Sequence, residues 1–264
     1  MATNSEAMSL NAAIADPTPR MEIAPNGKVE LFRGLKNQET GEWETTAIVK
    51  ELNGEDEEAL AALESDDDLL YAQYMSHLLK RSVLSIGNID ITKNPGLIDN
   101  LIIGDRDALF LETVRATYGI FREYQIICPH CVKSNDVQID LNDFPVKTSD
   151  KDPKEPLKVT LKDGTVMQFN LVTASDSQFV GLKARSIPEQ NTFLIARCAV
   201  WEEGKKPADP IAWAKKLGMK DRAKIVEALS EAQPGPEIKE VEALCAHCEQ
   251  PFPIMLNWAA LLFG

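Results

Sequence analysis

The stretch "YQIICPHCVKSNDVQIDL", residues 124–141, decides the fold, because the helical spacing upstream changes there to a period of two. Its centre is a Cys-Pro-His-Cys tetrapeptide, and apolar and polar residues alternate after it. This pattern predicts a strand, a tight knuckle and a second strand. The pattern returns in "EIKEVEALCAHCEQPFPIMLN", residues 237–257. Whether the two cysteine pairs form a redox centre or a metal site therefore decides the class of protein.

Two Cys-x-x-Cys pairs supply four thiolates, the tetrahedral ligand set that zinc prefers. They are Cys128, Cys131, Cys245 and Cys248, four of the five cysteines in the chain. The first pair ends at residue 131 and the second begins at residue 245, whereas compact zinc modules separate their pairs by roughly 15–20 residues. The strand–knuckle–strand context therefore carries the zinc assignment. The long segment between the pairs would be an inserted subdomain closed at its base by the ion.

A thiol-disulfide oxidoreductase or redox-regulated adaptor is the alternative interpretation of these cysteines. In a thioredoxin-like site the first cysteine opens a helix, whose dipole lowers the thiol pKa. Neither pair here is followed by a helical pattern, and Pro251 and Pro253 oppose a helix after the second pair. A redox enzyme would also need only one pair. Structural zinc is therefore favoured, while a zinc-ribbon transcription accessory protein stays open as a further alternative.

No constellation of catalytic residues stands out elsewhere in the chain. We find no defensible Ser/His/Asp set, no phosphate-binding loop and no G-x-G-x-x-G motif. His130 and His247 lie inside the knuckles and are interpreted as supporting or exposed residues, and His77 as an ordinary helix residue. A zinc ion with four cysteine ligands has no open coordination position. The sequence therefore predicts a protein that is not an enzyme.

The composition of the 264-residue chain is that of a globular protein, with 44% hydrophobic and 26% charged residues. A formal net charge of -13 disfavours direct nucleic-acid binding, which needs clustered Lys and Arg, and favours protein partners. No apolar run approaches the ~20 residues of a membrane helix. The first 20 residues have neither the basic region nor the apolar block of a secretory signal. We therefore expect a cytosolic protein, in which Cys-x-x-Cys pairs bind metal or act as dithiols.

The remaining pattern predicts an α+β fold of helices and short antiparallel hairpins. Expected strands lie at 28–35, 43–52, 82–92 and 157–173, the last two ranges each forming a hairpin. Expected helices begin at Asn53 or Gly54, near Leu70, near Asp105, at 175 (with Ser175 and Gln178 at capping-box spacing), at Asp209-Pro210 and at 220. Segment 144–156 is interpreted as a charged linker, and 192–201 as a buried element of undetermined type.

Several single features have ordinary structural interpretations. Cys198 is expected to be a small core residue. The acidic runs "GEDEE" (54–58) and "ESDDD" (64–68) are interpreted as solvated helix starts. For the apolar end "IMLNWAALLFG" (254–264), docking into a neighbour and core packing are equally open.

The predicted organisation has four parts. They are a flexible N-terminal arm (1–27), an N-terminal hairpin and helical region (28–123), two zinc-ribbon-like halves (124–143 and 237–264) and an inserted β-hairpin and helical subdomain (144–236).

The order of these motifs resembles a known family. "LIIGDRDALFLETVRATYG" (101–119) is followed by "YQIICPHC" and "VQIDL", "TTAIVKELNGEDEEAL" (45–60) precedes them, and "CAHC" (245–248) closes the series. This order resembles the baseplate hub and tail assembly proteins of contractile-tailed bacteriophages and of related phage-tail-like injection systems. The long N-terminal arm departs from that pattern.

The resemblance implies a structural or assembly role at the tail baseplate, with no catalytic residues to carry over. Implied partners are other tail and baseplate proteins, such as hub or tail tube components, within a larger assembly. The implied location is the virion tail, or the host cytoplasm during assembly. By motif match, Cys128, Cys131, Cys245 and Cys248 would hold one structural Zn²⁺ ion.

Overall fold

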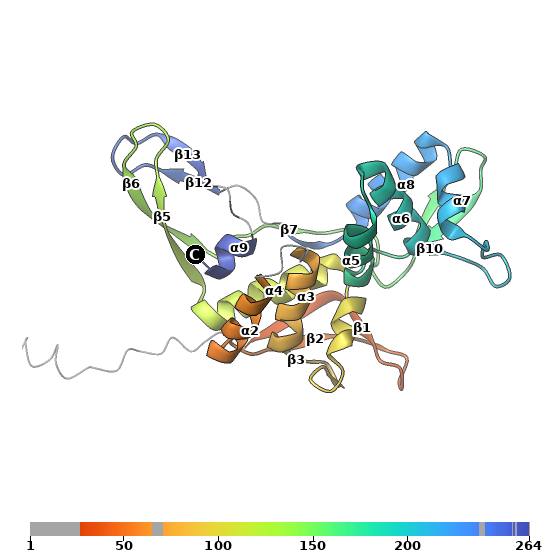
Figure 1. Cartoon of the computed structure of the whole chain (residues 1–264), viewed down its shortest axis with the longest axis horizontal. Coiled ribbons are helices and arrows are strands. Elements are labelled where there is room, and N and C mark those ends of the chain that lie inside the picture. Colours follow the sequence, from red (N-terminus) through yellow and green to blue (C-terminus); the bar gives the residue numbers. More distant parts are fainter. Residues whose placement is uncertain (1–26, 65–70, 238–240, 255, 257, 264) are drawn as a thin grey trace, which may run out of the picture.

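The structure is a computed structural model that describes residues 27–64, 71–237, 241–254, 256 and 258–263. All but the last residue of the predicted arm at 1–27, and all but the first residue of the acidic run 64–68, lie outside the described residues. The chain is α+β, as the sequence predicts. Figure 1 shows a central body from which two extensions project toward opposite ends of the molecule.

The described part of the chain forms helices and mostly short strands. The helices are α2 (Gly54–Glu64), α3 (Tyr71–Ser82), the 3-10 helix η1 (Pro95–Asn100), α4 (Ile103–Tyr118), α5 (Ala174–Lys183), α6 (Ile187–Cys198), α7 (Pro210–Lys216), α8 (Met219–Ala232) and α9 (Trp258–Phe263). The strands are β1 (Lys28–Lys36), β2 (Trp43–Val49), β3 (Val83–Ile86), β4 (Ile89–Asp90), β5 (Phe121–Ile127), β6 (Ser134–Asp140), β7 (Val146–Lys147), β8 (Leu157–Thr160), β9 (Val166–Phe169), β10 (Ala199–Val200), β11 (Gly235–Pro236), β12 (Val241–Leu244) and β13 (Pro251–Ile254).

The central body is an antiparallel sheet in the order β1-β2-β3-β4, covered by helices α2, α3 and α4 (Figure 1). The predicted hairpins at 28–52 and 82–92 form two of its ladders. Helix α4 is buried around most of its circumference, as expected of a helix in the middle of a core. Its Leu109, Phe110 and Val114 are at most 1% exposed and belong to the same apolar cluster as Leu31 and Ile86.

Asp105 attaches helix α4 to strand β1. Its carboxylate is fully buried and accepts hydrogen bonds from the backbone N–H groups of Phe32 (2.6 Å), Arg33 (3.3 Å) and Gly34 (2.8 Å). These donors are released because the β1–β2 register shifts between Glu30 and Leu35. Gly34 has a φ of 70°, and a Cβ there would lie 1.9 Å from the carbonyl oxygen of Glu44. Glycine is therefore required at the bulge.

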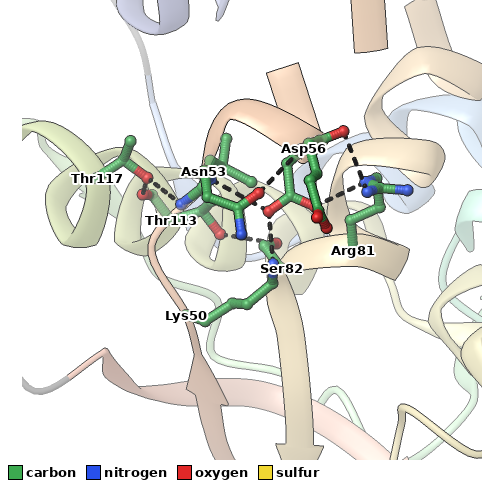
Figure 2. Close-up of polar contacts among 9 residues, drawn as sticks. Lys50, Asn53, Asp56, Arg81, Ser82, Thr113 and Thr117 are labelled. Carbon is green, nitrogen blue, oxygen red and sulfur yellow. Dashed lines mark hydrogen bonds and ion pairs between the residues drawn. The ribbon is translucent and has the colours of Figure 1, made fainter. Parts of the chain in front are cut away.

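Asp56 holds a second polar cluster, which Figure 2 shows between helices α2 and α3. Asn53 and Asp56 form a capping box, since each side chain accepts the other's backbone N–H, at 3.1 and 3.2 Å. The Asp56 carboxylate also binds Lys50 and the Nε of Arg81. Asp56 is 2% exposed. The interpretation of "GEDEE" as a solvated helix start was therefore wrong for this residue.

The larger extension contains β8–β10 and α5–α8 and has its own apolar cluster, which includes Phe169, Ile195 and Ile225. We call it the insert, residues 146–236. Its three-stranded sheet has the order β10-β9-β8, and β7 pairs with β11 where the chain enters and leaves it. The expected linker at 144–156 thus contains a short strand. The undetermined element at 192–201 is the end of α6 followed by β10.

The start of helix α5 differs from the prediction. The capping box consists of Thr173 and Asp176, not of Ser175 and Gln178. Gln178 instead reaches the central body, where its amide donates to Ser76 Oγ and, at 3.0 Å, to Asp99 Oδ1. The sequence spacing was right for a cap, but the competing pair lies two residues earlier. Gln178 therefore contributes to the contact between the insert and the body.

Candidate metal centre

The second extension is the cysteine arm, formed by the hairpins β5–β6 and β12–β13 (Figure 1). Each hairpin carries one Cys-x-x-Cys pair in its turn, as predicted. One ligand atom from each of Cys128, Cys131, Cys245 and Cys248 lies within 4.8 Å of the others. Between the hairpins, the sulfurs of Cys128 and Cys248 are 3.8 Å apart and those of Cys131 and Cys245 are 3.6 Å apart. The structure thus brings all four predicted ligand residues together.

The two knuckles have the same backbone construction. The N–H of Cys128 donates to the carbonyl of Lys133 (2.9 Å), and the N–H of Cys245 donates to the carbonyl of Gln250 (3.1 Å). The residue after each second cysteine, Val132 or Glu249, has a positive φ of 59° or 56°. Such a conformation is uncommon for a residue with a side chain, and it turns the chain back around the sulfurs. The strain is consistent with a built site.

Backbone N–H groups point at the sulfurs in both knuckles. The N–H of His130 donates to Cys128 Sγ and that of His247 donates to Cys245 Sγ, each at 3.4 Å. The histidine rings themselves reach across the arm. His130 Nε2 lies 3.2 Å from the carbonyl oxygen of Pro251, and His247 Nε2 lies 3.2 Å from that of Ser134. The histidines therefore join the two hairpins reciprocally, outside the four-sulfur cluster.

Asn135 adds a third connection that the sequence reasoning missed. It is 5% exposed, donates to the carbonyl of Lys133 (3.0 Å) and accepts from the N–H of Ala246 (2.9 Å). The signal that could have found it is an amide side chain placed on an expected buried face of a strand. It fixes the second knuckle against the base of the first.

The pKa values of two of the clustered thiols, Cys245 and Cys248, are shifted in opposite directions. Burial acts to raise the pKa of Cys245, but N–H groups of His247 and Cys248 and the neighbouring thiols lower it to about 6. At Cys248 the N–H of Gln250 acts to lower the pKa, while burial and the other three thiols together raise it to about 12. One thiolate thus forms readily and is hydrogen-bonded by its neighbours. A divalent cation would replace these shared protons.

The base of the arm packs against the central body through helix α9. Tyr124 of β5 donates from its hydroxyl to the carbonyl of Ala260 (3.1 Å), and Trp258 meets Phe110 of α4 edge-to-face with ring centroids 4.7 Å apart. Leu261 and Leu262 are at most 2% exposed and belong to the central apolar cluster. Of the two expectations for the apolar end of the chain, core packing holds for these residues.

The remaining cysteine and histidine lie away from this centre. Cys198 is 1% exposed in the insert, and burial raises its pKa to about 12, as expected of a small core residue. His77 is an exposed residue of helix α3. Among the described residues, the four arm cysteines are the one group of three or more His, Cys, Asp or Glu side chains with metal-binding spacing.

The geometry favours a metal over redox chemistry. Each knuckle is followed by a turn and a strand, so no helix dipole acts on either first cysteine. Cys128 and Cys245 are at most 1% exposed, whereas a reactive thiol must be accessible to its substrate. Four sulfurs within 4.8 Å match the donor set of a closed tetrahedral site. The arrangement defines an α+β protein with a zinc-ribbon-like four-cysteine centre joining distant parts of the chain.

A comparison with models of known protein families identifies the family of this chain. The chain belongs to the family of T4 bacteriophage base plate proteins, which matches residues 42–256. This confirms the resemblance to phage baseplate proteins, and the matched range includes both cysteine pairs. No curated protein and no solved structure matches the chain significantly. None of the described helices is long and apolar enough to span a membrane.

Proposed function

We propose that this chain is a structural or assembly protein of the hub region of a bacteriophage tail baseplate, stabilised by one structural zinc ion. Membership of the base plate protein family supports the baseplate role. The clustering of four cysteines from two distant hairpins carries the zinc assignment. Cys128, Cys131, Cys245 and Cys248 would hold the ion, which would supply a cross-link between the hairpins rather than a reactive centre.

A non-enzymatic role follows from this assignment. Four thiolates fill the coordination sphere of zinc and leave no position for water or substrate. The protein would act through surfaces that contact other tail and baseplate proteins, such as hub or tail tube components. It would be found in the virion tail, or in the host cytoplasm during assembly, without direct contact to nucleic acid. The net charge of -13 supports protein partners over nucleic acid.

The zinc assignment can be tested on the purified chain by elemental analysis together with thiol titration. We expect one tightly bound zinc ion per chain and four thiols that react only after chelation. A chain that is free of metal and forms a reversible Cys128–Cys131 disulfide would overturn the assignment and favour the oxidoreductase alternative.

The baseplate role is tested in phage particles. Mass spectrometry of purified virions and of assembly intermediates should detect the chain together with hub and tube proteins. Its presence in both identifies a permanent component, and its presence in intermediates alone identifies an assembly protein. Absence from both samples would contradict the proposal.

A further inference from the structure

A mostly apolar pocket lies where the insert joins the central body. It has a volume of about 340 Å³ and is lined by α4, α6, α8 and the strands β7 and β11. Its apolar wall includes Val172, Leu194, Val226 and Leu229. The approach of α4 to β11 is close, since a Cβ on Gly104 would lie 1.6 Å from the carbonyl oxygen of Pro234. The pocket is therefore a feature of the fold, set by backbone contacts.

Asp107 places a carboxylate on this otherwise apolar lining. Its side chain is partly buried and makes no hydrogen bond or ion pair with another residue that the structure describes. Burial raises its pKa to about 7, against a smaller opposing effect of Arg106. The Nη2 of Arg106 donates to the carbonyl of Ala72 (3.0 Å). A cation that enters the pocket would therefore stabilise the ionised form of this carboxylate, which burial destabilises.

Other polar groups around the pocket are already engaged. Lys147 donates from Nζ to the carbonyl of Ser230 (2.7 Å). Gln233, with its amide oxygen turned toward α4, accepts the N–H groups of Ile103 (2.9 Å) and Gly104 (3.2 Å), so the helix N-terminus is capped. Glu237 adds a second carboxyl group to the lining. Lys147 keeps its positive charge, but the carboxyl groups of Asp107 and Glu237 outnumber it on the lining, so a ligand meets a net negative charge when both are ionised.

We propose that this pocket receives a basic side chain of a partner protein, with the aliphatic stem against the apolar wall and the cationic head on the Asp107 carboxylate. Lysine and arginine have this division into an apolar stem and a charged end. A guanidinium fits best, because a carboxylate can accept two parallel hydrogen bonds from it. The net charge of -13 would attract a basic partner from a distance. The proposal rests on the proposed baseplate function only in one respect, namely that the partner would be another baseplate or tail protein.

The pocket chemistry can be tested with a small probe and the full, metal-bound chain. n-Butylguanidinium chloride carries the stem and head of arginine, and n-butanol carries the same stem without charge. Binding is followed by the amide NMR signals of residues lining the pocket, such as Gly104 and Ser230. We compare the native chain with D107N, and with D150N as a matched control that removes the same charge from an exposed loop of the insert.

We expect n-butylguanidinium to move the pocket signals of the native chain and of D150N equally. It should bind D107N at least tenfold more weakly, whereas n-butanol should bind all three chains alike. Equal binding to the native chain and D107N, or unmoved pocket signals, would overturn the proposal. A D107N spectrum that retains native dispersion confirms that the variant is folded. Because the probe needs no baseplate, absence of the chain from virions would contradict the proposed function without affecting this result.

Two other occupants have distinct outcomes. Lys239 follows Glu237 closely in sequence, and a K239A variant that binds the probe much more tightly than the native chain would show that the pocket is filled by its own chain. Weaker probe binding at higher protein concentration would identify a second copy as the occupant. Either result would overturn the assignment to a partner protein.

Discussion

The two extensions of the molecule are stabilised in different ways. The insert has its own apolar cluster, in which Phe169, Ile195 and Ile225 are fully buried, and is closed at its root by the β7–β11 pair. The cysteine arm consists of two hairpins whose buried apolar residues belong to the cluster of the central body. Its outer end instead contains the four sulfurs and the reciprocal histidine contacts.

This difference shows what each extension needs in order to stay folded. Two-stranded hairpins are marginal in water unless they pack against further structure, so the arm needs a cross-link. The proposed zinc ion would supply that cross-link without a local core. A three-stranded sheet with four helices can bury enough apolar surface to need no such device. The insert and the arm should therefore respond oppositely to loss of metal and to loss of apolar volume.

The largest effect is expected from breaking the metal centre. Replacing Cys245 with serine removes one of four ligands, and we expect loss of bound zinc and unprotected amide exchange across residues 121–140 and 241–254. The apparent zinc-binding free energy of small zinc modules is about 10–16 kcal/mol, so loss of the ion outweighs any single packing defect. Metal analysis and hydrogen exchange with mass spectrometry measure both effects.

Cys198→Ser is the matched control for this change. Cys198 is the same residue type and is also buried, but it lies in the apolar cluster of the insert. The variant should keep its zinc and lose only about 1–3 kcal/mol, because it places a hydroxyl among apolar side chains. A C198S chain that stays folded and yet loses zinc as completely as C245S would show that the metal does not belong to the arm.

The reverse experiment removes apolar volume from the insert. Phe169 is fully buried, and Phe169→Ala should cost about 3–5 kcal/mol of unfolding free energy. Increased exchange should be confined to residues 157–232, with zinc content unchanged. The contact between Trp201 and Trp213, whose ring centroids are 4.7 Å apart, supplies a local fluorescence signal for the insert. Loss of zinc in this variant would show that the two extensions unfold together.

The sequence was sufficient to predict features that depend on local spacing. The cysteine pairs, the flanking strands and the Asp163-Gly164 hairpin all follow from residue periods and turn chemistry. It could not predict the partners of buried polar residues. Asp56, Asp105 and Asn135 are common helix-start or strand-end residues whose roles depend on donors far away in the sequence.

The attachment of the insert was also beyond prediction. The expectation that the ion closes the segment between the cysteine pairs at its base followed from the separation of the pairs and their strand–knuckle–strand context. The structure places the two-residue pair β7–β11 at that root, while the hairpins β5–β6 and β12–β13, whose turns contain the cysteines, lie away from the insert (Figure 1). A strand pair of only two residues each, with no turn sequence joining them, cannot be recognised from local sequence. Such pairs are specified by the surrounding packing, here the contact of α4 with β11.

A smaller loss of unfolding free energy is expected when Asp56 is replaced. This residue lies in the central body, to which both extensions attach. Asp56→Ala removes the helix cap and the hydrogen bonds from Lys50 and Arg81, and should cost about 2–3 kcal/mol of unfolding free energy. Burial acts to raise the pKa of Asp56, but hydrogen bonds from Lys50, Asn53 and Arg81 lower it overall. Its contribution is therefore present above the unfolded-state pKa of about 3.9 and is lost as the pH falls through the lower folded-state value.

Urea unfolding of the native chain and of D56A between pH 2 and pH 7 measures this contribution. The difference in unfolding free energy should be largest at neutral pH and shrink below pH 4. Zinc content at neutral pH should be equal in the two chains, since Asp56 lies outside the arm. A difference that does not change with pH would show that Asp56 acts through packing alone.

The smallest expected effect has the opposite sign. Asp107 has a folded-state pKa raised to about 7 by burial, so between about pH 4 and pH 7 the folded chain holds a proton that the unfolded chain has released. Unfolding free energy therefore falls as the pH rises through this window. The full shift of about three pKa units corresponds to about 4 kcal/mol. Because Asp107 is partly exposed and solvent screens its charge, we expect Asp107→Asn to recover only about 1 kcal/mol of unfolding free energy at pH 8, a rise of roughly 2–4 °C in Tm. Near pH 4 the two chains should have the same Tm. A D107N chain that is less stable than the native chain at pH 8 would mean that the carboxylate already has a cationic partner there, supplied by the chain itself.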